Sequence, residues 1–170
     1  TSDSAEINDH GSATRSYLSQ DGALLGFAEF TDSLREGAQT VFKQLKAEHK
    51  KTAMLTGDHE QVALALGRII QVDEIHAGLT PHQKIELIES FQDQGQRVAM
   101  VGDGINDGPA LARADVGIAM GGGNEIALKS APVVLMRSDL RLIPEAIHYA
   151  RLTRRVIRQN LGWAFGYNIL

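Results

Sequence analysis

Short apolar runs alternate along the chain with segments whose apolar residues recur at helical spacing. The runs predict strands at 52–55, 74–77, 97–101, 116–120 and 132–135. The helical patterns between them predict helices at 58–70, 81–94, 107–113 and 124–130. Strands that alternate with helices on short loops form parallel sheets covered on both faces. The pattern therefore predicts an α/β fold, a three-layer α/β/α, Rossmann-like sandwich with right-handed crossovers.

The start of the chain has a different pattern. Two apolar-rich runs at 14–18 and 24–30 flank an Asp-Gly dipeptide, which favours the tight turn of a β-hairpin. Asp32 or Ser33 can then serve as the N-cap of a helix that ends near residue 48. We therefore expect a hairpin ahead of the α/β unit and a helix that leads into it.

The end of the chain combines a basic helix with an apolar run. A long helix is predicted over 140–159, with several arginines near its end. Residues 161–170 follow without a charged side chain, but crossing a bilayer core takes about 20 residues. Basic residues ahead of an aromatic-rich apolar run are typical of the cytoplasmic edge of a membrane helix. The alternative is a C-terminal helix docked on the core, and the pattern leaves both open.

Composition excludes several classes of function. The chain of 170 residues is long enough for one domain with a sizeable core. Its net charge of −4 leaves no large basic face, so nucleic acid is not expected as a main partner. Because cysteine is absent, disulfides, thiolate metal sites and cysteine nucleophiles are excluded within these residues.

The strongest candidate chemistry follows the third strand of the predicted sheet, in the sequence Gly102-Asp103-Gly104-Ile105-Asn106-Asp107. Ligands of open α/β sheets bind at the carboxyl ends of the strands. The two carboxylates suit Mg²⁺, which takes one or two of them together with phosphate and water. The glycines allow the backbone to approach an anion closely, and Asn106 offers an amide donor. A solvated Gly/Asp turn is the alternative for a shorter motif of this kind.

Two weaker signals accompany this motif. Thr56-Gly57-Asp58 follows the first strand of the predicted sheet, where a hydroxyl and the N–H groups of a helix start can bind phosphate oxygens. Asp58 is equally suited to capping that helix. Lys84 lies in the first turn of the next helix, where its ammonium could neutralise a phosphate, although a helical lysine is more often a solvated surface residue. Taken together, the three clusters predict a Mg²⁺–phosphate site.

The predicted site lacks an obvious nucleophile. Phosphoryl transfer through a covalent intermediate needs an activated carboxylate or an equivalent group. Once Asp103 and Asp107 are assigned to the metal, Asp58 is the remaining candidate. Its Thr-Gly-Asp setting favours phosphate binding instead.

The motifs resemble those of a known family. The sequence TGD, then PHQK at 81–84, then GDGINDGPALARADVGIAMG at 102–121 closely resembles the phosphorylation domain of P-type ATPases, a branch of the haloacid dehalogenase superfamily. The resemblance covers about residues 14–170, and the last motif is highly specific. Within the superfamily, ADVGIAMG and the following ALKSAPVVLM are most similar to the heavy-metal-transporting subgroup.

The resemblance implies a role for each site residue. The TGD motif would bind the phosphoryl group through Thr56 and Gly57, with Thr56, Asp58 and Lys84 as the catalytic residues. Lys84 would be the phosphate-stabilising lysine. The metal ligands would be Asp103 and Asp107, with Asn106 supporting the phosphate. The cofactors implied are Mg²⁺ and, in the complete protein, ATP.

The resemblance also implies a division of the chain. Residues 1–31 would be the end of a nucleotide-binding domain, 32–139 the C-terminal part of the phosphorylation domain, and 140–170 a linker helix and the start of a transmembrane helix. The implied partners are the rest of a pump polypeptide, the membrane and a transported metal ion. We expect a multi-pass membrane protein with this domain on the cytoplasmic side.

The identity of the transported metal rests on a short match. Asn160, Tyr167 and Asn168 match the N…YN pattern of the seventh membrane helix in the copper(I) subgroup. Relatives of the zinc type usually lack the Tyr-Asn pair. The resemblance therefore implies Cu(I) export.

The chain departs from the family pattern in ways that bear on its activity. The DKTGT segment, whose aspartate is phosphorylated, is absent, so the sheet is expected to lack one strand and to have an exposed edge. Gly108 stands where alanine is usual, and Pro132 where aspartate is usual. We therefore expect an incomplete haloacid dehalogenase fold that belongs to a larger pump and is inactive alone. The alternatives are a free-standing Mg²⁺-dependent phosphatase and a non-catalytic remnant or binding module.

Overall fold

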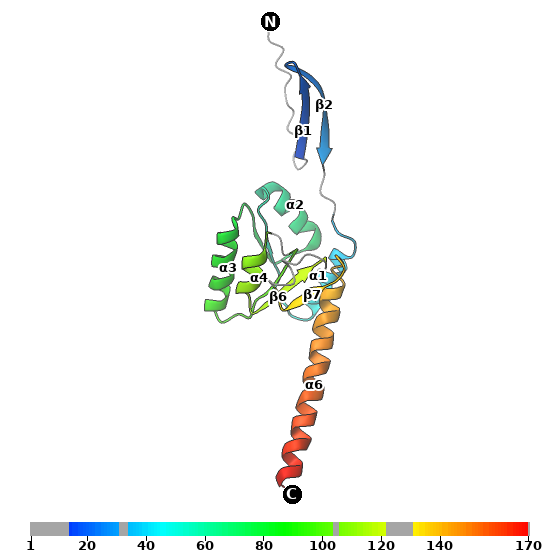
Figure 1. Cartoon of the computed structure of the whole chain (residues 1–170), viewed down its shortest axis with the longest axis vertical. Coiled ribbons are helices and arrows are strands. Elements are labelled where there is room, and N and C mark those ends of the chain that lie inside the picture. The colour runs from blue at the N-terminus through cyan, green and yellow to red at the C-terminus, as the bar shows by residue number, and fades with distance from the viewer. Residues whose placement is uncertain (1–13, 31–33, 104–105, 122–130, 170) are drawn as a thin grey trace.

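The computed structural model describes residues 14–30, 34–103, 106–121 and 131–169. Figure 1 shows an α/β body with a two-stranded hairpin on one side and a long helix that projects on the other. The strands are β1 Thr14–Gln20, β2 Ala23–Phe30, β3 Ala53–Leu55, β4 Glu74–His76, β5 Ala99–Gly102, β6 Val116–Met120 and β7 Val133–Leu135. The helices are α1 Ala38–Ala47, α2 Glu60–Ile70, α3 Pro81–Asp93, α4 Gly108–Arg113 and α6 Leu142–Ile169.

The predicted hairpin is confirmed. β1 and β2 pair antiparallel and are joined at Asp21 and Gly22. Both turn residues have positive φ, 50° for Asp21 and 83° for Gly22. A two-residue turn of this kind matches the twist of the strands, and Asp-Gly tolerates it well.

The strands of the body are parallel, as predicted. β3 pairs with β4, and β5, β6 and β7 form a second group in that order. In the described part of the chain, β3 and β5 are not hydrogen-bonded to each other, so the sheet is in two parts rather than continuous. β3 is also poorly covered, since Ala53 is exposed and Met54 and Leu55 are half-buried.

Helices cover both faces of β6, which confirms the three-layer arrangement. On one face Ala119 packs in a cluster with Ile88 of α3 and Leu111 of α4. On the other face Ile118 and Met120 pack with residues of β7 and with the start of α6. Successive strand residues point to opposite faces, so this division of contacts places helices on each side of the sheet.

Two predicted helix bounds are wrong. α1 begins at Ala38 rather than beside Asp32 or Ser33, which lie outside the described residues. Its N-cap is Gly37, whose φ of 78° favours glycine, and the Arg141 side chain packs against that glycine. α6 does not end at 159 but continues to Ile169. The helix predicted at 124–130 lies outside the described residues.

The other predicted elements are confirmed with small shifts of their ends. Gly95, predicted to end the helix before it, has a φ of 79° just after α3. None of the helices in the described ranges has both the length and the apolar content needed to cross a bilayer.

Candidate functional site

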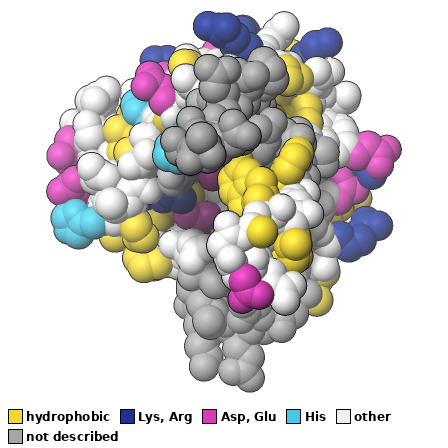
Figure 2. Space-filling model, turned by 90° about the horizontal axis from the view of Figure 1, so that it is seen from above, with side chains coloured by type: hydrophobic (Ala, Val, Ile, Leu, Met, Phe, Trp, Pro, Cys, Tyr) yellow, Lys and Arg dark blue, Asp and Glu magenta, His cyan; other side chains and the backbone are white. Residues whose placement is uncertain are grey.

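The centre of the candidate site is an ion pair between two residues that the sequence singled out separately. Lys84 Nζ lies 2.6 Å from Asp107 Oδ1. The two side chains are only 12% and 17% exposed, so water screens them less than a surface pair. In Figure 2, basic and acidic side chains are visible within a recess of the face shown.

Lys84 is held by the start of α3. Thr80 caps this helix, since Gln83 N–H donates to Thr80 Oγ1 at 3.3 Å and Thr80 N–H donates to Gln83 Oε1 at 2.9 Å. The backbone N–H groups of Thr80 and Gln83, which have no partner within the helix, thereby gain acceptors, and this fixes the first turn. The backbone N–H of Lys84 donates to Thr80 O at 3.1 Å within that turn. Sequence analysis overlooked this capping box, although Thr-x-x-Gln before an apolar run is its usual signature.

Asp107 is held by the start of α4 and by a glycine. It is the N-cap residue of α4, and its carbonyl accepts the N–H of Leu111 at 2.8 Å. Its carboxylate does not cap the helix but reaches Lys84. A Cβ at Gly102 would lie 2.7 Å from Asp107 Oδ2, closer than real contacts allow. Glycine at 102 is therefore required for this position of the carboxylate.

The Thr56-Gly57-Asp58 loop forms a compact turn after β3. The Thr56 hydroxyl donates to Asp58 Oδ2 at 2.7 Å, and Asp58 N–H donates back to Thr56 Oγ1 at 3.1 Å. The suggestion that Asp58 caps α2 is wrong, since the N-cap is His59 and the Asp58 carboxylate is engaged by Thr56.

The same loop is tied to the segment that leads into α3. Leu79 N–H donates to Thr56 O, and Gly78 N–H donates to Asp58 O, each at 2.9 Å. Since α3 begins two residues after Leu79, these bonds link the TGD loop to the helix that carries Lys84.

The remaining predicted residues lie at the carboxyl end of β5. Asp103 directly follows β5 and is exposed, and Asn106 is exposed just ahead of α4. Gly104 lies outside the described residues. The structure thus brings Lys84 of α3 into contact with Asp107 ahead of α4, and Thr56 into contact with Asp58 in the loop after β3.

Comparison with known proteins identifies the fold. The family model for haloacid dehalogenase-like hydrolases matches residues 3–115. The chain belongs to this family. The parallel strands and the position of the candidate residues at their carboxyl ends agree with a Rossmann-like domain of this haloacid dehalogenase-like type.

Relatives of this haloacid dehalogenase-like chain include copper-exporting P-type ATPases. It is 45% identical over 152 residues to a copper-exporting P-type ATPase of Staphylococcus haemolyticus (strain JCSC1435), a match that covers 89% of this chain and 19% of that protein. A copper-exporting P-type ATPase of Staphylococcus aureus (strain bovine RF122 / ET3-1) is 46% identical over 147 residues, covering 86% and 18%. The chain therefore spans about a fifth of the length of these curated relatives.

Solved structures of ATPases superpose on this chain. A zinc-transporting PIB-type ATPase in its E2.Pi state superposes with a TM-score of 0.73 at 38% identity, covering 87% of this chain and 24% of that one. The catalytic domain of a CPx-ATPase superposes with a TM-score of 0.58 at 28% identity, covering 79% and 61%.

The donors at the end of β5 fit a magnesium ion in their chemistry. Asp103 and Asp107 offer carboxylate oxygens, and Mg²⁺ in phosphate sites is usually bound by one or two carboxylates with the phosphate completing its shell. A site in which protein side chains alone complete the metal shell needs more ligands than these two. Among the described residues, no group of three or more His, Cys, Asp or Glu could hold a metal ion in that way.

Two carboxylates outside the site, those of Asp115 and Asp73, accept hydrogen bonds from residues that directly precede β5 and β3. The sequence analysis did not single them out. The Val98 N–H, then Arg97 and Gln92, hold the pKa of the Asp115 carboxyl well below its usual range. The backbone N–H and hydroxyl of Thr52 lower the pKa of Asp73 in the same way.

The residues expected to bind the transported metal lie on α6. Asn160 and Tyr167 are seven positions apart on this helix and are both exposed. Residues at this spacing lie on one helix face. Asn168 belongs to the same helix, and its side chain is not among those that the structure describes.

Proposed function

We propose that this chain is part of a P-type ATPase that uses ATP to export copper(I). The Lys84–Asp107 ion pair carries the proposal, since it lies beside loops at the carboxyl ends of parallel strands in a chain 45% identical to copper-exporting pumps. An ammonium held beside a carboxylate, on a helix whose lead-in segment is hydrogen-bonded to a Thr-Gly-Asp turn, suits a reaction in which a phosphoryl group is bound and released.

The proposed roles follow from the chemistry of each group. Lys84 binds the phosphoryl oxygens, because an ammonium has three donors and its bond to Asp107 uses one of them. Gly57 contributes a backbone N–H of the TGD turn. The Thr56 hydroxyl donates a hydrogen bond to the Asp58 carboxylate in the free chain and, in this proposal, turns to a phosphoryl oxygen when the phosphoryl group binds. Asn106 donates to a phosphate oxygen.

Magnesium, when held by Asp103 and Asp107, supplies positive charge beside the phosphate. The chain's own contribution is to keep these carboxylates at the end of β5. Gly102 and the start of α4 do this for Asp107, and the backbone at the end of β5 does it for Asp103.

The nucleophilic aspartate belongs, in this proposal, to a DKTGT segment outside the chain. The separation of the sheet supports this, since β3 and β5 are unpaired with each other and β3 is poorly covered. A strand inserted between them would complete a continuous parallel sheet. It would end beside Thr56 and Asp103, where an aspartyl phosphate could reach Lys84.

Two further parts of the proposal concern the ends of the chain. The hairpin, within residues 1–31, is the end of a nucleotide-binding domain, and residues 32–139 form part of the phosphorylation domain. Residues 140–170 are a linker helix that enters the membrane. The α/β body then lies on the cytoplasmic side of a multi-pass protein, with the remaining pump domains as its partners.

Copper(I) is proposed as the cargo on the names of the relatives and on three residues. The curated relatives at 45% and 46% identity are called copper-exporting, whereas the superposed zinc-transporting pump is 38% identical. Asn160, Tyr167 and Asn168 of α6 are the residues proposed to contact the ion.

The test uses a longer polypeptide that contains this chain together with a DKTGT segment. We expect Asp103→Asn and Lys84→Gln each to lower the phosphoenzyme formed from labelled ATP on the order of 100-fold. Lys84→Gln removes a positive charge beside the developing phosphoryl group, and Asp103→Asn removes a carboxylate proposed to hold Mg²⁺. Lys43→Gln, a change at an exposed residue of α1, is the matched control and should form normal phosphoenzyme.

The outcomes separate the parts of the proposal. Normal phosphoenzyme in Asp103→Asn would contradict the assigned site. Phosphoenzyme that forms in response to Zn²⁺ and not to Cu(I) would contradict the cargo and leave the site intact.

A further inference from the structure

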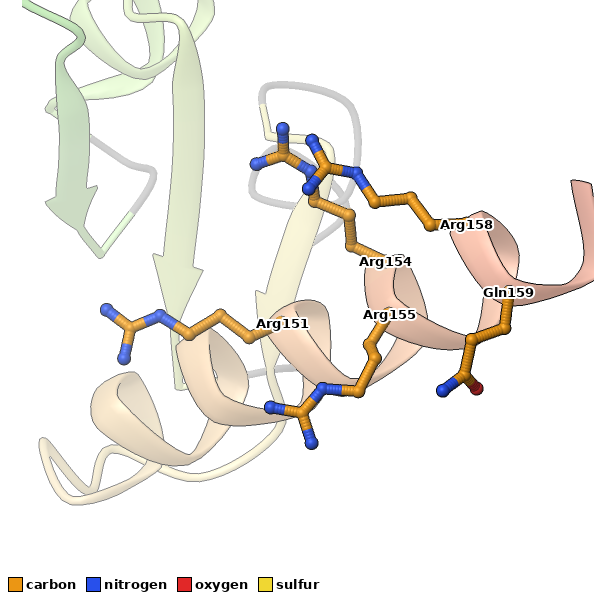
Figure 3. Close-up of a pocket in the computed structure, with 5 residues that line it drawn as sticks. All are labelled: Arg151, Arg154, Arg155, Arg158 and Gln159. Atoms are coloured by element: carbon orange, nitrogen blue, oxygen red, sulfur yellow. The ribbon is translucent and has the colours of Figure 1, made fainter. Parts of the chain in front are cut away.

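One face of α6 carries a group of arginines, Arg151, Arg154, Arg155 and Arg158. Their spacing of three and four residues places them on adjacent turns of the helix. Figure 3 shows all four guanidinium groups extending away from the helix axis. Each of these residues is exposed.

These arginines differ in what they contact. Arg151 Nη2 lies 2.7 Å from Glu48 Oε2 at the end of α1 and is thereby tied to the body. Within the described residues, Arg154, Arg155 and Arg158 have no ion-pair partner. Like charges on adjacent turns repel each other, so a cluster of three exposed arginines favours an anionic ligand.

The same helix continues into a row of exposed aromatic side chains. Trp163, Phe165 and Tyr167 are 80%, 67% and 85% exposed, although side chains of this size normally bury most of their surface. Val156, Ile157 and Leu161 are also exposed along this part of α6. In Figure 1 this half of the helix projects away from the α/β body.

We propose that Arg154, Arg155 and Arg158 bind the phosphate headgroups of an anionic lipid bilayer. Guanidinium groups pair with phosphate through two parallel hydrogen bonds, which favours arginine over lysine in this role. Aromatic side chains with an apolar body and a polar edge gather at the boundary between headgroups and acyl chains. The proposal rests on the proposed function in that α6 leads to a membrane. It deepens that function by naming the lipid chemistry that α6 contacts, and it does not depend on phosphoryl transfer.

The spacing along α6 suits this arrangement. At a rise of about 1.5 Å per residue, Trp163 lies roughly 7.5 Å and Tyr167 roughly 13.5 Å beyond Arg158 along the helix. The headgroup region on each side of a bilayer is about 5–8 Å thick. Arginines at the headgroups therefore bring Trp163 to the edge of the hydrocarbon. Because the whole chain has a net charge of −4, its attraction to an anionic surface comes from this local cluster of arginines.

The test measures binding of the 170-residue chain to vesicles of phosphatidylcholine alone and of phosphatidylcholine with phosphatidylglycerol. Trp163 is the single tryptophan, so a shift of its emission to shorter wavelength reports entry into the bilayer. A basic residue at an anionic surface contributes about 1 kcal/mol, or about fivefold in affinity. We therefore expect Arg154→Gln/Arg155→Gln/Arg158→Gln to weaken binding to the anionic vesicles on the order of 100-fold.

The control removes the same charge elsewhere. Arg35→Gln/Arg68→Gln/Arg137→Gln changes three exposed arginines away from α6 and should leave binding close to that of the parent chain. Raising the salt from about 0.1 M to about 1 M shortens the Debye length from about 10 Å to about 3 Å and should release the parent chain. Far-ultraviolet circular dichroism of each variant verifies that the fold is kept.

Several results would overturn the proposal. One is equal binding to neutral and anionic vesicles. Another is a triple variant of α6 that binds as well as the parent. A chain that self-associates through α6 and ignores vesicles, or that binds a duplex oligonucleotide more tightly than anionic vesicles, would show that the face serves a protein or nucleic acid partner. None of these results would alter the phosphoenzyme assay, so the two proposals fail separately.

Discussion

At the residue scale, the candidate site depends on contacts between side chains that are far apart in the sequence. Lys84 and Asp107 are separated by 23 positions and meet at 2.6 Å. The sequence indicated that both residues carry chemistry, but assigned Lys84 to phosphate and Asp107 to metal. Their contact could not be predicted, because it depends on how α3 and α4 pack against each other.

Gly102 tests the geometry of this pair. A Cβ there would lie 2.7 Å from Asp107 Oδ2, so Gly102→Ala must displace the carboxylate. We expect phosphoenzyme formation in the longer polypeptide to fall on the order of 100-fold, since misplacement by about 1 Å has that effect on catalytic groups.

The control for this change is Gly162→Ala in α6, where a Cβ would meet nothing within 4 Å. It should retain normal phosphorylation. Thermal unfolding of both variants separates loss of geometry from loss of fold. Normal phosphorylation in a folded Gly102→Ala variant would show that the position of Asp107 does not matter.

At the element scale, the helices and strands of the body follow the apolar pattern, and polar contacts refine their ends. The capping box at Thr80 and Gln83 begins α3, and Asp115 ties the start of β5 to the loop before β6. A pattern of apolar residues locates the middle of an element well. It locates the ends less well, as α1 shows, because caps and positive-φ turns decide them.

Asp115 gives a prediction for the pH dependence of stability. Its pKa is lowered by the N–H of Val98, then by Arg97 and Gln92, so the folded state favours the ionised carboxylate. This contribution is fully present above the unfolded pKa of about 3.9 and is lost as the pH falls through the lower folded value. Asp115→Asn should therefore be less stable than the parent at pH 7, with a difference that shrinks below about pH 4.

Urea unfolding at a series of pH values measures this difference. Asp93→Asn, at an exposed position in the last turn of α3, is the matched control and should follow the parent at each pH. A constant difference between Asp115→Asn and the parent down to low pH would argue against the role of its ionised form.

At the scale of the whole molecule, α6 has two parts. Its first turns belong to the core, where Ile143 packs with Ile118, Met120 and Leu135. Its later turns project from the body and carry the arginines and aromatic residues described above (Figure 1).

Two isoleucines of α6 distinguish these parts. Ile143 is 8% exposed and Ile157 is 52% exposed. Ile143→Ala should lower the free energy of unfolding by about 2–5 kcal/mol, because it leaves a cavity in the core. Ile157→Ala should change it by about 0.5 kcal/mol or less. Equal losses in the two variants, measured by chemical denaturation, would show that the projecting half contributes to the core after all.

The sequence by itself determined the fold class, the hairpin, the parallel strands and the loops in which the candidate residues lie. These features follow from local rules, since the period of apolar positions, the turn residues and the motif at 102–121 act within short stretches of chain. The resemblance drawn from that motif agrees with the family model and the relatives.

Only the tertiary structure decided how these parts meet. It paired Lys84 with Asp107, separated β3 from β5 and extended α6 as one helix to Ile169 with its arginines exposed. Each of these outcomes depends on packing between segments distant in the sequence. Such packing is set by the sum of many weak contacts across the whole core, which no local pattern contains.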